Sequence, residues 1–415
     1  MRIFIAGIDG YLGWTLAQYL TERGHTVGGL DNGLRRKLVR EIGSDSATTA
    51  WSMRERIKVF DRRIQFWDAD MLNCNKVYEI LEEFKPDAIV HLAEIPSAPY
   101  SMINAAAAAL TYENNVVGTL NLLHAMRDKC PDAHLLKLGT MGEYGTPNVD
   151  IPEGFFEIEY RGREARMPFP RQAGSWYHQT KVADSQNIEM ACKIWGLRST
   201  DIMQGVVYGT RMPNAKKREK DNVYGGLCDG CSKADLEDES FDERLLTRFD
   251  FDGVFGTAIN RFVAQALIGH PITVYGTGEQ LRGFLPLQDS MQCLTLALEN
   301  PPGVGEYRVF NQFETVYSIN ELASIVARVG VGMGLGGEVR HLENPRHEAA
   351  EHYYNPDCEH LINLGYVPTG NIESVIQGMF TDLESSKRII WQLKHVLIPD
   401  VQWKGERRSA PYING

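Results

Sequence analysis

Tyr177 and Lys181 are the residues whose types and spacing point most directly to chemistry. They lie four positions apart in a segment with helical periodicity, so both side chains project from one face of the predicted helix. A phenol in water has a pKa of about 10, and a neighbouring ammonium is expected to lower that pKa. Thr140, at the end of a predicted strand, adds a hydroxyl that can bond to a substrate oxygen. The three groups predict oxidation of an alcohol, in which the tyrosine takes the proton while a bound cofactor takes the hydride.

A glycine-rich segment lies between the first predicted strand, over residues 2–6, and a predicted helix over residues 11–23. Gly7, Gly10 and Gly13 allow a tight turn and a close approach of the backbone to a pyrophosphate. The N-terminus of the helix directs its free N–H groups at the phosphates. Chance matches to this glycine pattern are expected in a chain with 39 glycines, but here the pattern has the required strand and helix on either side. The segment therefore predicts a dinucleotide site.

Asp31 ends the second predicted strand, about 20 residues after the glycines, where a carboxylate can accept both ribose hydroxyls of NAD. Arg35 and Arg36 favour NADP instead, but they follow in a segment predicted to be irregular, so Asp31 carries more weight. Asp70 and Met71 follow the third predicted strand and are placed to contact the adenine, or else form a simple loop turn. The predicted contacts to NAD are Gly7, Gly10, Tyr11, Leu12, Gly13, Asp31, Asn32, Arg35, Arg36, Asp70, Met71, Leu92, Asn115, Tyr177, Lys181 and Val207.

The elements that must position these residues alternate between strand and helix. Strands are predicted over 2–6, 26–31, 64–68, 88–92, 134–138 and 198–203, and helices over 11–23, 76–84, 115–127 and 175–195. This alternation predicts an α/β fold, with a Rossmann-type doubly wound parallel sheet over residues 1–205. The order of loop, fifth strand and Tyr177 also favours a catalytic pair over a surface pair on a helix.

The second half is less regular. Residues 206–415 are predicted to form a smaller mixed α/β part that binds substrate, with some segments returning to the first domain. A helix is expected over 254–268, a strand over 273–275, a strand over 307–311 and a helix over 319–329. The charged stretch 211–248 is predicted to be a long loop. Its single Cys228-x-x-Cys231 pair is weak support for zinc, so no metal is expected.

The composition of the chain disfavours several classes of binding partner and location. A formal net charge of −11 disfavours nucleic acid, and no apolar run reaches the roughly 20 residues that span a bilayer. The seven cysteines are scattered and odd in number, which favours a cytoplasmic protein over a disulfide-linked one.

Longer strings of sequence resemble the extended short-chain dehydrogenase/reductase family, and within it the UDP-sulfoquinovose synthase branch. The resemblance covers nearly the whole chain outside the charged stretch. Its strings are GYLGW at 10–14, SAPYSM at 97–102, LGTMGEYGTP at 138–147, QGVVYG at 204–209, FGTA at 255–258, TVYG at 273–276, NPR at 344–346 and EHYYN at 351–355.

The resemblance implies a nucleotide-sugar enzyme that oxidises C4 of UDP-glucose with bound NAD. The 4-keto group then acidifies the C5 proton, water leaves from C6, and sulfite adds to the enone. Thr140, Tyr177 and Lys181 would be the oxidation set, and Glu143 would move the C5 proton or else stabilise a turn. The resemblance also implies a homodimer and a UDP- or GDP-linked sugar bound by His178, Gln204, Thr257, Ala258, Val274, Tyr275, Arg282 and Arg346.

One departure keeps the final step open. The family typically has Glu-Gln-Arg where this chain has Glu94-Ile95-Pro96, and the arginine is a natural anchor for sulfite. Its loss fits a 4-epimerase on an unusual sugar. A standard 4,6-dehydratase is disfavoured because Met141 and Gly142 stand where that class has Asp-Glu. A non-catalytic NAD sensor on the same fold is a remote alternative, because such proteins usually lack the Tyr/Lys pair.

Overall fold

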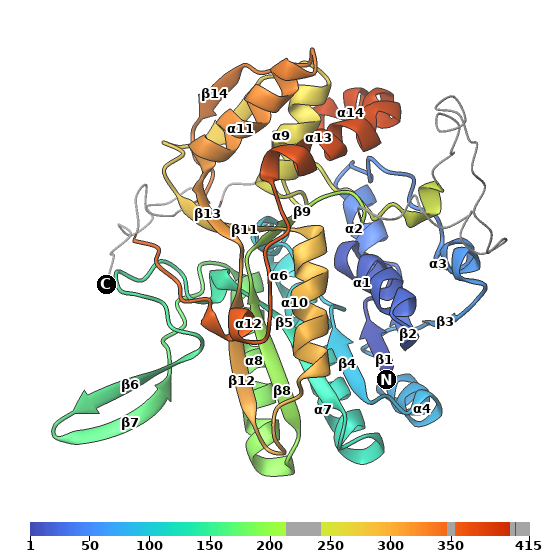
Figure 1. Ribbon diagram of the computed structural model, residues 1–415, viewed down its shortest axis with the longest axis vertical. Coiled ribbons are helices and arrows are strands. Elements are labelled where there is room, and N and C mark those ends of the chain that lie inside the picture. The colour runs from blue at the N-terminus through green and yellow to red at the C-terminus, as the bar shows by residue number, and fades with distance from the viewer. Residues whose placement is uncertain (213–241, 347–352, 399–402, 404–415) are drawn as a thin grey trace, which may run out of the picture.

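A seven-stranded parallel sheet forms the centre of the computed structural model, which describes residues 1–212, 242–346, 353–398 and 403 (Figure 1). The strand order is β12-β8-β5-β4-β1-β2-β3, and it reverses direction between β1 and β4. This order confirms the predicted doubly wound sheet. The strands are β1 (Arg2–Ala6), β2 (Thr26–Asp31), β3 (Ile64–Asp68), β4 (Ala88–His91), β5 (His134–Thr140), β8 (Arg198–Gln204) and β12 (Tyr307–Gln312).

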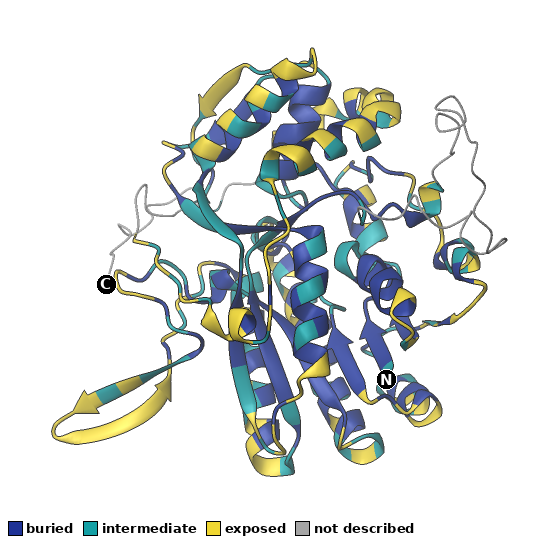
Figure 2. Ribbon diagram, in the orientation of Figure 1, coloured by how far each residue is buried: buried dark blue, intermediate teal, exposed yellow. Residues whose placement is uncertain are grey.

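Helices cover both faces of the sheet, so its central strands are buried on both sides (Figure 2). Their buried side chains are mostly apolar, as expected for parallel strands, but β5 also carries the buried Lys137. Helices α1 (Tyr11–Glu22) and α10 (Leu287–Glu299) share one core with Ile3, Ile5 and Val27 of the strands. On the other face, α4 (Cys74–Phe84), α7 (Gly118–Lys129) and α8 (Trp176–Trp195) pack around Phe4 and Ile89.

A second core lies above the carboxyl ends of the strands (Figure 1). There α9 (Ala258–Leu267), α11 (Ile319–Gly332) and α13 (Ile372–Leu383) surround the paired strands β10 (Ile272–Tyr275) and β14 (Val339–Leu342). A three-stranded sheet of β13 (Thr315–Ser318), β11 (Leu281–Pro286) and β9 (Val206–Tyr208) lies between this core and the main sheet (Figure 1).

The remaining elements are short or peripheral. A hairpin of β6 (Phe155–Tyr160) and β7 (Arg163–Pro168) projects from the body (Figure 1). The other helices are α2 (Leu34–Glu41), α3 (Met53–Arg56), α5 (Ala98–Ser101), α6 (Ala105–Tyr112), α12 (Glu359–Asn363) and α14 (Lys387–Gln392), with a π-helical turn over Glu113–Val117 before α7.

Two local predictions were wrong. The segment after β2 is not irregular, because Asn32 accepts a hydrogen bond from the Leu34 N–H at the start of α2. This helix buries only Leu38 and Val39, so its sequence shows little apolar periodicity. Helix α9 begins at Ala258 rather than at 254, because the Thr257 hydroxyl accepts from the Asn260 N–H and caps it.

The charged stretch 211–248 lies largely outside the described residues, and so do Cys228 and Cys231. Its last residues, however, pack on α1: the Trp14 indole donates to the Arg244 carbonyl, and the Thr247 hydroxyl donates to the Tyr11 carbonyl.

Within the described residues, the chain shows neither a membrane-spanning helix nor a metal cluster. No helix there is both long and apolar enough to cross a bilayer, and no cluster of three or more potential ligand side chains could hold a metal ion.

The glycine loop between β1 and α1 brings backbone into close contact. Gly7 has φ of +88°, which a residue with a side chain rarely adopts, and a Cβ on Gly13 would lie 2.1 Å from the Gly7 carbonyl oxygen. The two glycines therefore allow α1 to start directly against the turn.

Replacing Gly13 with alanine should push α1 away from the turn and lower the free energy of unfolding by about 1–3 kcal/mol. Chemical denaturation followed by circular dichroism measures this. The matched control is Gly378→Ala in α13, where an added Cβ meets nothing within 4 Å. This change should be neutral or stabilising by up to about 1 kcal/mol. Equal stability of the Gly13 variant and the unchanged protein would contradict the packing argument.

Candidate active site

A cavity of about 510 Å³ lies between the carboxyl ends of the main sheet and the second core. In doubly wound folds, ligands bind at this edge, where the strand order reverses. Most of the predicted site residues line the cavity: Gly7, Gly10, Tyr11, Leu12, Gly13, Asp31, Asn32, Arg35, Asp70, Met71, Leu92, Thr140, Tyr177, His178, Lys181, Gln204, Val207, Thr257, Arg282 and Arg346.

Asp31 presents its carboxylate at the end of β2, where it accepts from the backbone N–H groups of Asp9 at 3.0 Å and Gly33 at 2.8 Å. Burial, followed by repulsion from the Asp9 carboxylate, raises the pKa of Asp31 to about 6. Arg36 does not line this cavity. Its guanidinium pairs with Asp9 and donates to the carbonyls of Ala50 and Trp51.

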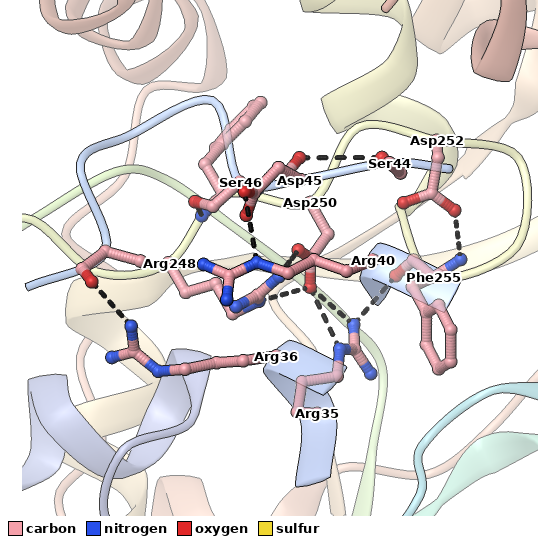
Figure 3. A network of polar contacts seen from close by, with 12 residues as sticks. Arg35, Arg36, Arg40, Ser44, Asp45, Ser46, Arg248, Asp250, Asp252 and Phe255 are labelled. Carbon is pink, nitrogen blue, oxygen red and sulfur yellow. Dashed lines mark hydrogen bonds and ion pairs between the residues drawn. The ribbon is translucent and has the colours of Figure 1, made fainter. Parts of the chain in front are cut away.

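Arg35 belongs to a network that the sequence did not reveal (Figure 3). Its Nε and Nη2 atoms donate to one oxygen of Asp250, and Arg248 donates to the same carboxylate from the other side. The Arg35 guanidinium also lies 4.3 Å from the centre of the Phe255 ring. Arg35, Arg248, Asp250 and Phe255 all line the cavity, so these contacts hold the segment 248–255 against α2 as its wall.

Thr140, Tyr177 and Lys181 meet at the cavity from two elements. Thr140 ends β5, and its hydroxyl accepts from the Gly142 N–H. Tyr177 lies in the first turn of α8, which the Ser175 hydroxyl caps by accepting from the His178 N–H. The Lys181 ammonium lies 6.0 Å from the centre of the Tyr177 ring and donates to the Leu138 carbonyl.

The expected activation of Tyr177 by Lys181 is wrong for the cofactor-free protein. Burial raises the pKa of the Tyr177 phenol, and the carboxylates of Glu94 and Glu143 raise it further. The physical reason lies in the ion pair of Lys181, whose Nζ atom is 2.6 Å from Glu94 Oε2. A neutralised ammonium exerts little net attraction on a phenolate.

Glu143 is buried behind the cavity wall. Its carboxylate pairs with Lys137 and Arg171, accepts from the Ser185 hydroxyl, and accepts from the Thr140 N–H. Burial opposes ionisation, but Lys137 and Arg171 outweigh it and lower the pKa of Glu143. This position fits a carboxylate that stabilises the Thr140 turn better than one that exchanges a proton with substrate.

Four other predicted contacts also lie away from the cavity wall. Asn115 is fully buried. Its side-chain oxygen accepts from the Ile95 N–H, and its side-chain nitrogen donates to the Thr180 hydroxyl. Asn115 therefore positions the loop after β4 against α8. Val274 is part of the second core, the Tyr275 hydroxyl accepts from Arg261, and Ala258 opens α9.

Sequence reasoning missed Glu94, Lys137, Arg171, Arg248 and Asp250. A usable pattern existed for Glu94, because it follows β4 at the same sheet edge as Asp31 and Thr140. The other four became visible only with the tertiary structure.

Lys137 is fully buried and lies 3.1 Å from Glu143 and 3.3 Å from Asp201. In Lys137→Met, both carboxylates lose their central cation, and the unfolding free energy at pH 7 should fall by about 3–5 kcal/mol. The pKa of Glu143 is lowered in the folded protein, so its stabilising contribution is present above the unfolded pKa and lost as pH falls through the folded pKa. The gap between variant and unchanged protein should therefore narrow in acid.

Urea unfolding at several pH values measures this effect. The exposed Lys76, which pairs with Glu79 on the surface of α4, supplies the control Lys76→Met, and its midpoint should not move. A Lys137→Met midpoint equal to that of the control would show that the buried network contributes nothing.

Known proteins are similar to this chain over nearly its whole length. Residues 3–229 match the NAD dependent epimerase/dehydratase family. The UDP-sulfoquinovose synthase of Sulfolobus acidocaldarius is 44% identical over 409 residues, which cover 97% of this chain and 98% of that protein. The chloroplastic UDP-sulfoquinovose synthase of Spinacia oleracea is 42% identical over 407 residues, covering 97% and 79% respectively.

Among solved structures, UDP-glucuronic acid 4-epimerase from Bacillus cereus, in complex with UDP-glucuronic acid and NAD, is similar with a TM-score of 0.67. The two chains are 20% identical, and the match covers 93% of this chain and 99% of the epimerase. That similarity supports the fold. The family match and the two relatives go further, and the chain belongs to the NAD-dependent epimerase/dehydratase family.

Proposed function

We propose that the protein is an NAD-dependent enzyme that modifies a UDP-linked sugar through a transient 4-keto intermediate, in the manner of UDP-sulfoquinovose synthase. One observation carries this proposal. A single cavity holds the glycine loop and Asp31 at one end, Thr140, Tyr177 and Lys181 in the middle, and two arginines beyond them.

The cavity fits a dinucleotide. The turn leaves no room for a side chain at Gly7 or Gly13. These glycines let α1 start directly against the turn, with its N-terminus at the cavity where a pyrophosphate would bind. Asp31 would hold the adenosine ribose and Lys181 the nicotinamide ribose. Bound NAD supplies the hydride acceptor, and it is regenerated when the hydride returns.

The residues of the chain then divide the remaining tasks. Arg282 and Arg346 would grip the sugar-nucleotide diphosphate, because the planar guanidinium matches phosphate oxygens in pairs. Thr140 would orient the sugar hydroxyl, and Tyr177 would accept its proton. His178, next to Tyr177 on the cavity wall, would contact the sugar or the incoming acceptor.

Two candidates remain for the final step. Identity above 40% along nearly the whole chain to two UDP-sulfoquinovose synthases favours addition of sulfite. A 4-epimerase is favoured by the loop after β4, where Pro96 lines the cavity and Ile95 is buried. Neither side chain can donate to an anion.

Mass spectrometry of UDP-glucose incubated with the protein and NAD, with and without sulfite, separates these outcomes. A sulfite-dependent product is expected, whereas a change of configuration without a change of mass indicates an epimerase. Tyr177→Phe should slow turnover by about 10²–10⁴-fold and leave substrate binding intact. Full activity of that variant would remove the phenol from the reaction.

The ionisation of Asp31 should make NAD binding depend on pH. Its pKa of about 6 in the cofactor-free protein should fall when ribose hydroxyls donate to the carboxylate. NAD binding should then release a proton near pH 6, and affinity should rise as pH increases from 5 to 7. Calorimetry in buffers of different ionisation enthalpy detects the proton. Asp31→Asn should bind weakly at both pH values, and equal proton release in that variant would assign the effect to another group.

We also propose that the protein works as a cytoplasmic homodimer. The apolar side chains of Trp176 and Ile194 on α8 are 50% and 68% exposed, and the Trp176 ring packs edge-on against Tyr112 of α6. A second copy covering this face would bury them.

A further inference from the structure

Glu94 is a carboxylate in the cavity wall with no part in the mechanism described so far. It lies three residues after the end of β4, and its side chain is 2% exposed. Its Oε2 atom lies 2.6 Å from the ammonium of Lys181, and its Oε1 atom lies 3.9 Å from His91 Nε2. A carboxylate held this far from water needs a cation beside it.

The surrounding groups identify Lys181 as that cation. Burial lowers the pKa of His91 to about 4, so this ring is neutral at pH 7. Burial and the charge of Glu94 raise the pKa of Asp184 well above its usual range. Lys137 is already paired with Glu143 and Asp201. The charge on Glu94 is therefore balanced by Lys181.

The ion pair between Glu94 and Lys181 also affects the ionisation of Tyr177, which lies one turn before Lys181 on α8. The charged groups that act on the phenol are Glu94 and Glu143, which oppose its ionisation, and Lys137 and Arg35, which favour it. Lys137 and Arg35 are each paired with a carboxylate, and Glu94 pairs Lys181. These contacts weaken the attraction that each of the three cations exerts on a phenolate.

We propose that Glu94 is a positioning residue that holds Lys181 and neutralises it, so that Tyr177 stays protonated until an oxidised, cationic nicotinamide enters the cavity. The inference rests on the proposed function only for the identity of that cofactor. Its physical basis is the cost of an isolated phenolate in a buried site, which Glu94 prevents from forming before the cofactor is in place.

The test is the ionisation of Tyr177 in the cofactor-free protein. Tyrosine labelled with ¹³C at Cζ is followed by NMR during a pH titration, and Tyr177→Phe assigns the signal. In Glu94→Gln, the Tyr177 titration should move to lower pH by about 1 or more. Glu94→Asp keeps the charge and should titrate as the unchanged protein does. The matched control is the exposed Glu113, and Glu113→Gln should leave the signal unchanged.

A Glu94→Gln titration identical to that of the unchanged protein overturns the proposal, and so does a Glu94→Asp titration that follows Glu94→Gln. If Glu94→Gln does not fold, Lys181→Gln replaces it. There the bare Glu94 carboxylate should move the Tyr177 titration to higher pH, and an unmoved titration overturns the proposal.

A second readout uses the loaded enzyme. In single-turnover reduction of bound NAD by substrate, the acid limb of the pH profile should also move to lower pH in Glu94→Gln. If no sugar reduces bound NAD, the proposed function fails, while the NMR titration still decides the role of Glu94.

Discussion

The buried ion pair between Lys137 and Glu143 is the interaction on which the geometry of the site depends. Both side chains are fully buried, and an ion in such a place must be paired and hydrogen-bonded. The hydrogen-bond partners of these two ions come from several elements. Glu143 accepts from the Thr140 N–H, and Lys137 donates to the Lys181 carbonyl and the Ser185 hydroxyl of α8. Thr140 and α8, which carries Tyr177 and Lys181, are thereby fixed to one strand, β5.

The same network reaches the second half of the chain. Asp201 of β8 lies 3.3 Å from Lys137 and accepts from the Tyr307 hydroxyl of β12 at 2.7 Å. Strand β12 is the seventh strand of the main sheet, so the C-terminal half contributes to the support of the active site as well as to its roof. Arg282 on β11 and Arg346 after β14 line the same cavity as Thr140, Tyr177 and Lys181.

Charged side chains around this cavity are held in buried ion pairs and clusters. Arg35 and Arg248 share Asp250 (Figure 3). Arg36 and Arg56 share Asp9, and Lys181 pairs with Glu94. Pairing lowers the cost of burying each ion. Burial, and after it the carboxylates of Glu94 and Glu143, raise the pKa of the Tyr177 phenol in the cofactor-free protein. If Glu94 holds Lys181 as proposed, activation of that phenol depends on the cofactor.

Local sequence patterns predict the sheet, the glycine loop, the position of Asp31 and the Tyr177/Lys181 pair. These features depend on local patterns: apolar runs that make strands, glycines between a strand and a helix, and a four-residue spacing on a helix. Each pattern places a residue relative to its neighbours in the chain, and the sheet edge then collects the strand ends in one place.

Only the tertiary structure decided which charges meet. Asp250 lies 215 positions from Arg35, and Asp201 lies 64 positions from Lys137. No local periodicity encodes such pairs, because they arise where separate elements pack together. For the same reason the sequence assigned Glu143 to the substrate and Arg36 to the cofactor, whereas packing joined Glu143 to Lys137 and Arg36 to Asp9. The type of a charged residue follows from the sequence, but its partner follows from the fold.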